Sequence, residues 1–453
     1  MDKTIDYFYE ISKIPRESGN EKEISNYIVE FAKKRNLEYY QDKYNNVIIK
    51  HYKGSNEPII LQAHLDMVCT KKDNYKFDFS KDPIEITNSN GYLTALNTTL
   101  GADNGIGVAQ ILNILDSNLN INIEAIFTTE EETTMYGAKM INLDNIKGKK
   151  LISFDGFNKN TILIESAGFY DIDVFINNIK EKDINNFYEI KIYNLKGGHS
   201  GLDIATNKLN ANIEIANILR KIDNLRINSF VGGDQNNVIP TSAKVIFSTN
   251  ISYDELINII NKNIDKLKNI EKSIKIEINK LDNINVSLNI KDTNNLIDSI
   301  TSFNNGVVYK ENENIILSQN LGVVNLDKNH FKIGMRSSRK TLASNLLKED
   351  EKLFDSYNMK LKLLDFQPGF CTDKNSSLVK DIIKAYKNIS KNKLDVKSIH
   401  IGVEGGYFKE KIKDLEVVII SPEINGAHSP GENVNIDSIY ECNKWIFEYL
   451  NNL

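Results

Sequence analysis

The stretch IEAIFTTEEETTMYGA, residues 123–138, decides how the fold is interpreted, because an apolar run in it leads directly into three glutamates. The run AIF at 125–127 predicts a buried strand, and Glu130, Glu131 and Glu132 follow at its carboxyl end. Adjacent like charges repel one another and resist removal from water. We therefore expect compensating positive charge beside the end of this strand.

Strands and helices alternate on both sides of this stretch. Apolar runs predict strands at 45–52, 58–68 and 149–155, and apolar residues at helical spacing predict helices within 2–34 and at 106–118. Strands that are apolar throughout are typical of a sheet that helices cover on both faces. The sequence therefore predicts an α/β domain.

The pattern changes after about Gly168. From 171 to 366, alternating strands lie between amphipathic helices such as the one at 254–270, which is typical of an α+β domain. Long helices and an apolar strand return toward the C-terminus. We therefore expect one α/β domain formed by residues 1–170 and 367–453, interrupted by an inserted α+β domain at 171–366.

Composition narrows the class of protein. Hydrophobic residues make up 41% and charged residues 26% of the chain, which is ordinary for a globular protein. The formal net charge of -5 argues against nucleic acid or an anionic membrane as the main partner. Cys69, Cys371 and Cys442 are odd in number and widely spaced, as in a reducing compartment without disulfides. No leader peptide and no long apolar span are visible, so we expect a cytoplasmic protein.

Histidines and carboxylates follow several predicted strands. His64 and Asp66 are two residues apart at a strand end, so they share a face and Asp66 can orient the imidazole. Taken alone, this pair favours a purely structural hydrogen bond that stabilises the strand end. Asp103 lies among glycines before a helix, where a helix cap is the ordinary use. Gln110 replaces the third glycine of a dinucleotide-binding pattern, which argues against a nucleotide site.

Asp155 ends a further strand, and His428 lies in a loop near the C-terminus. Ligands of α/β sheets bind beyond the carboxyl ends of strands. Two histidines and three or four carboxylates at that place would suit two divalent cations, and zinc fits these donors best. Such cations would compensate the glutamate run.

Eight stretches taken together resemble the M20 family of di-zinc peptidases, and within it the aminoacyl-histidine (Xaa-His) dipeptidases. They follow the order of the family and run nearly from end to end of the chain. The stretches are FYEISKIPRESGNEKEI, LQAHLDMV, TTLGADNGIGVA, EEETTMYGA, KGGHSGLDI, GGDQNNVIP, IHIGVEGGYF and AHSPGENV.

The resemblance implies a set of five metal ligands. Asp103 would bridge two ions, with His64 and Asp155 completing one site and Glu132 and His428 completing the other. The ions would be Zn²⁺, with Co²⁺ or Mn²⁺ as alternatives. The resemblance also implies a cis peptide bond after Asp103.

Catalytic roles follow from the same resemblance. Asp66 would lie behind the ligand His64, and Glu131 would act as general base on a water that bridges the metals. His199 of the inserted domain would stabilise the oxyanion of the tetrahedral intermediate.

The glutamate register has two possibilities, because the family shows a pair of glutamates where this chain has three. Counting back from Gly137 makes Glu131 the base and Glu132 the ligand. This register requires the chain to leave strand geometry near Thr129 or Glu130. The alternative makes Glu130 the base and Glu131 the ligand.

Three further residues are candidates for substrate binding. Asn237 and Arg336 would hold the substrate, and the guanidinium of Arg336 suits a terminal carboxylate. A surface ion pair is the alternative for Arg336. Glu404 would line the pocket for the substrate amine.

We therefore expect a cytoplasmic two-zinc dipeptidase for Xaa-His or a broader range of dipeptides. The inserted domain would act as a lid and as the interface of a homodimer. A tripeptidase, an aminopeptidase or an N-acyl amino-acid deacylase of the same family is the first alternative. A non-catalytic binding protein of the same fold is the second.

Overall fold

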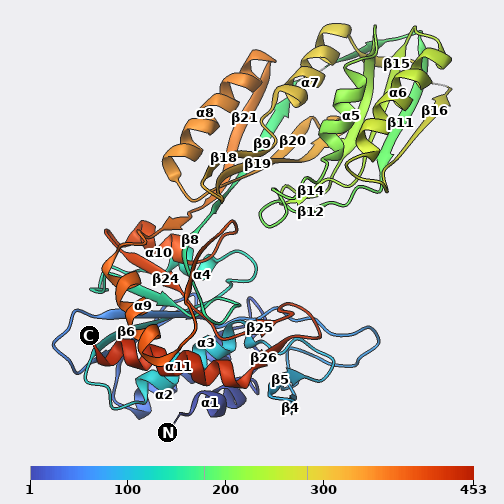
Figure 1. Cartoon of the computed structure of the whole chain (residues 1–453). Coiled ribbons are helices and arrows are strands. Elements are labelled where there is room, and N and C mark those ends of the chain that lie inside the picture. The colour runs from blue at the N-terminus through green and yellow to red at the C-terminus, as the bar shows by residue number, and fades with distance from the viewer. Residues whose placement is uncertain (1, 178, 283) are drawn as a thin grey trace. The chain divides into compact units, whose positions relative to one another are not determined.

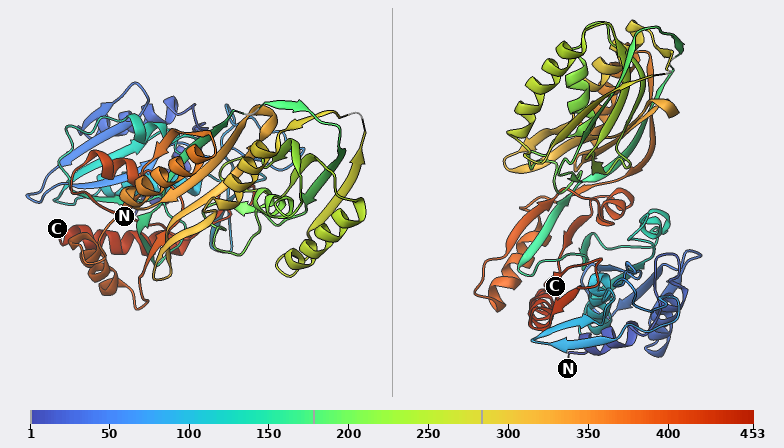
Figure 2. Two further views of the ribbon diagram at one scale, coloured as in Figure 1. Left: turned by 90° about the horizontal axis from the view of Figure 1, so that it is seen from above. Right: turned by 90° about the vertical axis from the view of Figure 1, so that its right-hand side faces the viewer.

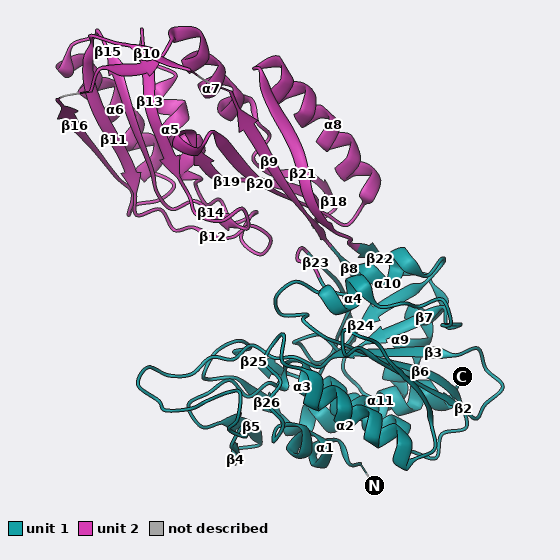
Figure 3. Cartoon of the chain, turned by 180° about the vertical axis from the view of Figure 1, so that it is seen from behind, with its two compact units in different colours: residues 1–166, 370–399, 403–453 teal, residues 167–369, 400–402 magenta. Residues whose placement is uncertain are grey.

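The computed structural model describes residues 2–177, 179–282 and 284–453 (Figure 1). The chain divides into two compact units, which Figure 3 colours separately. Unit 1 comprises residues 1–166, 370–399 and 403–453, and unit 2 comprises residues 167–369 and 400–402. Among the described residues, no helix has both the length and the apolar character needed to cross a membrane.

Unit 1 is built on a nine-stranded mixed sheet. In order of pairing, its strands are β1 (Glu38–Gln41), β2 (Val47–Tyr52), β6 (Asn122–Thr128), β3 (Ile59–His64), β7 (Lys150–Ser153), β24 (Glu416–Ile419), β8 (Thr161–Ser166) and β22 (Phe370–Cys371), with β23 (Asp395–Ile399) also paired to β8. Strands β6, β3, β7 and β24 run parallel to one another. The carboxyl ends of these four strands therefore lie at the same end of the sheet.

Helices cover both faces of this sheet. They are α1 (Thr4–Ile11), α2 (Lys22–Lys34), α3 (Ala102–Leu115), α4 (Tyr136–Met140), α9 (Ser377–Ile389), α10 (Gly405–Lys411) and α11 (Ile436–Asn451). Ile59, Leu61 and Ala63 of β3 pack into one core with α1, α2, α3, α9 and α11, whereas Ile60 packs into another with α4 and α10. Successive residues of a strand point to opposite faces, so a wholly apolar strand needs both layers. The predicted α/β class, with a mixed sheet flanked by helices, is confirmed.

A small four-stranded sheet joins two segments of unit 1 that are far apart in the sequence. Its strands, in order, are β25 (Ile424–Asn425), β26 (Asn433–Asn435), β5 (Tyr92–Ala95) and β4 (Ile86–Ser89). Val434 of β26 pairs with Leu93 of β5. The loop between β25 and β26 is thereby tied to the chain that leads to α3.

Unit 2 contains a second nine-stranded sheet, whose described pairs are all antiparallel. In order of pairing, its strands are β16 (Lys275–Leu281), β11 (Asn186–Tyr193), β15 (Ala243–Thr249), β13 (Arg226–Gly232), β19 (Asn314–Asn325), β20 (His330–Ser337), β9 (Gly168–Ile176) and β21 (Met359–Gln367), with β18 (Gly306–Glu311) also paired to β19. Two short pairs and a 3-10 helix complete the unit: β10 (Lys180–Lys182) with β17 (Val286–Leu288), β12 (Gly198–His199) with β14 (Val238–Ile239), and η1 (Leu326–Lys328).

The helices of unit 2 lie on one face of its sheet (Figure 2). They are α5 (Ala211–Leu219), α6 (Tyr253–Lys268), α7 (Ile290–Ser302) and α8 (Lys340–Ser356). Along most of β9, buried residues alternate with partly exposed ones, and its buried residues join a single core with all four helices. This is the arrangement expected of an α+β unit. Its role as a lid and dimer interface stays a prediction.

Candidate metal centre

Five of the predicted site residues come together beyond the carboxyl ends of the parallel strands of unit 1. His64 is the last residue of β3, Glu132 follows β6, and Asp155 follows β7. Asp103 lies in the first turn of α3, and His428 lies in the loop between β25 and β26. The topology of the sheet therefore gathers side chains from five segments in one place.

Asp103 lies at the centre of this group. Its Oδ1 is 3.2 Å from Nε2 of His64, and its Oδ2 is 3.2 Å from Nε2 of His428. Nε2 of His64 is also 3.5 Å from Oδ1 of Asp155. Nε2 of His428 is 3.0 Å from Oε2 of Glu132. The two oxygens of one carboxylate thus face two separate sets of donor atoms.

The residue after Asp103 contacts the candidate ligand Asp155. The peptide bond between Asp103 and Asn104 is cis, as the resemblance implies. The side-chain amide of Asn104 donates to the carbonyl of Phe154 at 2.9 Å and to Oδ1 of Asp155 at 3.2 Å. Oδ1 of Asp155 is therefore oriented by an amide as well as by an imidazole.

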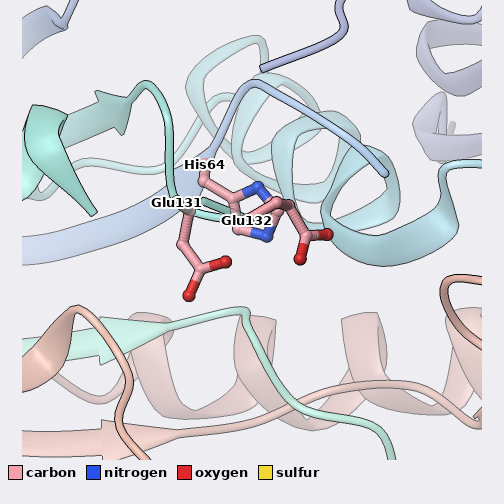
Figure 4. Close-up of side chains that lie close together, drawn as sticks. All are labelled: His64, Glu131 and Glu132. Atoms are coloured by element: carbon pink, nitrogen blue, oxygen red, sulfur yellow. The ribbon is translucent and has the colours of Figure 1, made fainter. Parts of the chain in front are cut away.

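The donor atoms are close enough together to share cations. Within each of three groups, the possible ligand atoms lie within 4.8 Å of one another: His64, Asp103 and Asp155; Asp103, Glu132 and His428; and His64, Glu131 and Glu132. Figure 4 shows the side chains of the third group. Oε1 of Glu132 is buried and has no hydrogen-bond partner among the described residues. Imidazole nitrogens and carboxylate oxygens are ordinary zinc ligands, so this set fits a divalent cation.

The cluster has an excess of negative charge. Burial raises the pKa of Glu131, and neighbouring carboxylates raise it further. Contacts with Asp103 and Glu132 raise the pKa of His428 to about 10. Burial lowers the pKa of His64, but its carboxylate contacts outweigh burial and the net shift is upward. The neighbouring carboxylates therefore favour the protonated, cationic form of both imidazoles. This agrees with the positive charge that we expect beside the glutamate run.

The chain turns sharply after β6. Glu130 has a φ of +54°, in the left-handed region, and its carbonyl accepts the N–H of Met135 at 2.7 Å. Oδ1 of Asp66 accepts the N–H of Glu131, and its Oδ2 accepts the N–H of Glu132, each at 3.1 Å. The chain therefore leaves strand geometry by Glu130. The register in which Glu131 is the base requires the chain to do so near Thr129 or Glu130. Within the described residues, Glu130 belongs to none of the three cation groups.

Asp66 also contacts the imidazole of His64. Its Oδ1 lies 3.3 Å from Nδ1 of His64, and its Oδ2 accepts the hydroxyl of Ser18 at 2.7 Å. Contact at Nδ1 leaves Nε2 of His64 facing Asp103, an arrangement that suits a metal-binding imidazole.

Glu404 lies beneath the ends of β3 and β6. Its Oε2 accepts the amide of Gln62 and the hydroxyl of Thr128, each at 2.6 Å. Its Oε1 is buried without a hydrogen-bond partner among the described residues. Burial raises the pKa of Glu404 to about 8. Its contact with a substrate amine stays a prediction.

The three candidates in the inserted domain come together within unit 2. His199 belongs to β12, which pairs with β14, and the carbonyl of Asn237 accepts the N–H of Ser200 at 2.8 Å. Arg336 on β20 donates from Nε to the hydroxyl of Ser200 at 3.3 Å, and its guanidinium lies 4.7 Å from the centre of the Phe169 ring. Arg336 is 5% exposed, so it is not the surface residue of the alternative interpretation.

The geometry around His199 indicates a pair of converging donors. Its Nδ1 accepts the N–H groups of Gly201 and Leu202, each at 3.2 Å, so the neutral ring carries its proton on Nε2. Burial and the charge of Arg336 lower the pKa of His199, which keeps the ring neutral. Nη2 of Arg336 lies 3.2 Å from this Nε2, and no carboxylate pairs with Arg336 among the described residues. Two N–H groups that meet without an acceptor suit an anionic oxygen.

The structure adds two buried charges that the sequence analysis does not single out, Arg16 and Glu432. Both lie within stretches that carry the resemblance, RESG at 16–19 and PGEN at 430–433. Both contact the backbone of segments that carry candidate ligands. A charged residue inside a motif is the only signal that the sequence offers for them.

Comparisons with known proteins show which proteins this chain is similar to. The model of peptidase family M20/M25/M40 matches residues 60–452. The cytosol non-specific dipeptidase of Escherichia coli (strain K12) is 30% identical over 459 residues, covering 96% of this chain and 94% of that protein. The crystal structure of aminoacylhistidine dipeptidase from Vibrio alginolyticus superposes with a TM-score of 0.92 at 28% identity, covering 99% of this chain and 96% of that one. Aminopeptidase PepT from Bacillus cereus shares the fold, with a TM-score of 0.57 at 14% identity over 99% and 97% of the two chains.

Proposed function

Because the chain belongs to peptidase family M20/M25/M40, we propose that it is a dipeptidase that works with two divalent cations. Membership confirms the resemblance and makes the chain a peptide-bond hydrolase. The geometry of each unit, taken by itself, supports the roles proposed for its cation-binding, catalytic and substrate-binding residues.

One observation carries the proposal. The two oxygens of Asp103 face two histidines at 3.2 Å each, and each histidine has a further carboxylate of its own. Asp103 would hold both cations, His64 and Asp155 would complete one site, and Glu132 and His428 would complete the other. These nitrogen and oxygen donors favour zinc, with Co²⁺ or Mn²⁺ as alternatives.

The side chains of unit 1 have separate tasks. When bound, divalent cations polarise the scissile carbonyl and lower the pKa of the attacking water. Glu131 takes the proton from that water and gives it to the leaving amine. Asp66 holds the backbone of Glu131 and the ring of His64, so that base and ligand keep their relative positions.

Unit 2 supplies donors for the substrate. His199 donates from Nε2 to the oxyanion that forms at the scissile carbonyl. Arg336 binds the terminal carboxylate, since its buried guanidinium has no carboxylate partner among the described residues. Asn237 immediately precedes β14, which pairs with the strand of His199, and adds a polar side chain for the substrate backbone.

The substrates are free dipeptides, of the Xaa-His type or of a broader range. Two dipeptidases similar to this chain are named cytosol non-specific dipeptidase and aminoacylhistidine dipeptidase. We also propose a cytosolic location, which is supported by the name of the Escherichia coli protein and by the free thiols of Cys69, Cys371 and Cys442.

A substrate panel tests the function. The zinc-loaded protein is assayed with Xaa-His dipeptides, other dipeptides, tripeptides and N-acetyl amino acids under one set of conditions. The proposal expects the highest kcat/KM for dipeptides. Faster hydrolysis of tripeptides or acetylated amino acids would replace the dipeptidase with a related hydrolase of the family.

A further inference from the structure

Two buried side chains of opposite charge lie behind the candidate metal centre without contributing a ligand to it. Arg16 is 2% exposed and Glu432 is 1% exposed. Burying a charge is unfavourable unless hydrogen bonds or an opposite charge compensate it. The compensation here comes from the backbone of the ligand-bearing segments.

Glu432 accepts four consecutive backbone N–H groups. Its Oε2 accepts those of Leu100 and Gly101, each at 2.8 Å, and its Oε1 accepts those of Ala102 and Asp103 at 2.7 and 3.1 Å. The first N–H groups of a helix have no carbonyl partner within the helix, and the helix dipole favours an anion beside them. Glu432 therefore fixes the backbone from which Asp103 projects.

Glu432 also belongs to the segment that carries His428. Its N–H donates to the carbonyl of Ser429 at 3.0 Å, and β26 starts at the next residue. His428 itself has a φ of +66°, so its loop has an unusual backbone that needs support. A single carboxylate thus connects the loop of His428 to the helix start of Asp103.

Arg16 makes the corresponding connection on the other side. Its Nη1 donates to the carbonyls of Leu65 and Asp66, each at 3.1 Å, and its Nη2 donates to the carbonyl of Gly101 at 2.5 Å. Gly101 has a φ of +69°, and a Cβ there would lie 2.4 Å from Nη2, so this approach requires glycine. Arg16 therefore joins the end of β3, where His64 lies, to the start of α3.

We propose that Arg16 and Glu432 are positioning residues that hold the segments of His64, Asp103 and His428 in the cation-binding arrangement before any cation is bound. The three segments are linked through one guanidinium and one carboxylate, and among the described residues the hydrogen bonds of both groups go to backbone atoms. The carboxylate of Glu432 is the foremost of the acids that favour the charged form of Arg16 against burial. This inference rests on the proposed function, because it presumes cations at Asp103.

A comparison of three variants tests the proposal. Glu432→Gln removes half of the acceptor capacity, and Arg16→Lys cannot reach three carbonyls at once. Glu124→Gln is the matched control, because Glu124 is 0% exposed and also accepts two backbone N–H groups, those of Lys147 and Gly148, beside the amino end of β6. Each protein is freed of metal, and its apparent Zn²⁺ affinity is measured by competition with a chromogenic chelator.

We expect Glu432→Gln and Arg16→Lys to weaken Zn²⁺ binding about 10–100-fold, as outer-shell substitutions do, and Glu124→Gln to bind Zn²⁺ like the wild type. Each of the three variants loses a buried hydrogen-bond acceptor or donor, so each is expected to be less stable than the wild type. Urea unfolding of the metal-free proteins measures this loss of stability separately from the Zn²⁺ affinity. Wild-type affinity in both test variants, or equal weakening in all three, would overturn the proposal. A wild type that binds no Zn²⁺ would instead overturn the proposed function.

Hydrogen exchange of the wild type gives a second test that needs no variant. The amides of residues 100–103 are followed by mass spectrometry in the metal-free protein. Exchange as slow as in β3 is expected if Glu432 holds them without metal. Rapid exchange that becomes slow only on addition of Zn²⁺ would contradict an arrangement formed in advance.

Discussion

Oδ1 of Asp66 accepts the backbone N–H of Glu131 at 3.1 Å. Its other oxygen accepts the next N–H along the chain, and the same carboxylate contacts the ring of His64. One fully buried aspartate thus holds the proposed base and a proposed ligand from opposite sides. This contact separates the three glutamates, because Asp66 accepts the N–H groups of Glu131 and Glu132, whereas Oε1 of Glu21 accepts that of Glu130.

The division predicts unequal effects of neighbouring substitutions. Glu131→Gln is expected to lower kcat about 10²–10⁴-fold, the usual worth of a positioned general base. Glu130→Gln should change kcat little, because its side chain belongs to no cation group among the described residues. Steady-state kinetics with one dipeptide, together with the zinc content of each protein, provides the measurement. A severe loss in Glu130→Gln with an active Glu131→Gln would establish the alternative register.

The donor at Nε2 of His199 is expected to act on the transition state. His199→Gln should lower kcat about 10²–10³-fold with little change in KM, as the loss of an oxyanion donor does. His330→Gln is the control, because His330 is a second, partly exposed histidine of unit 2 with no proposed role. A rise in KM at constant kcat would assign His199 to substrate binding instead.

Arg336 is expected to recognise the carboxylate of the substrate. Arg336→Met should raise KM for a free dipeptide about 10–100-fold, in line with the loss of hydrogen bonds to a charged group, and should affect the corresponding dipeptide amide much less. Arg220→Met, at a side chain that is 56% exposed in the same unit, serves as the control. Equal effects on the acid and the amide would exclude this role.

A buried acid in unit 2 predicts a pH dependence of stability. Burial raises the pKa of Asp350 from 3.8 to about 7. The folded state then holds the proton more tightly than the unfolded state, so stability falls as the pH rises from about 4 to 7 and is constant above it. Asp350→Asn removes this titration, and its unfolding free energy relative to the wild type should rise over that range by at most about 4 kcal/mol.

Urea unfolding at pH 4, 6 and 8 measures this difference. The exposed Asp355 lies on the same helix, so Asp355→Asn is the control and should show no comparable rise. A constant difference between Asp350→Asn and the wild type at all three pH values would show that Asp350 titrates normally.

The elements with strong periodicity could be predicted from the sequence. β3 and β6 contain short apolar runs, at 59–61 and 125–127, and α11 has a regular apolar stripe, so their types follow directly. Strand β21 has a weaker signal, since most of its residues are exposed or partly exposed. It is specified by its long pairing with β9, which local sequence does not reveal.

Some residues of the candidate site could likewise be predicted from the sequence, and others could not. His64 and Asp155 could be named because polar residues at the ends of apolar strands are conspicuous, whereas Asp103 precedes a helix and its role follows from the resemblance. Arg16 and Glu432 could not, because burial of a charge depends on segments distant in the sequence. The register in which Glu131 is the base requires a turn near Glu130, but local sequence does not predict that turn. Glu130 has a left-handed backbone conformation, which tertiary contacts impose.

The central claim is that Asp103 joins two cations in one hydrolytic site. Its most direct test is to titrate the metal-free protein with Zn²⁺ while following hydrolysis of a dipeptide. The account predicts no hydrolysis without metal and full activity only when two Zn²⁺ per chain are bound. Full activity in the metal-free protein, or a plateau at one Zn²⁺ or fewer per chain, would contradict it.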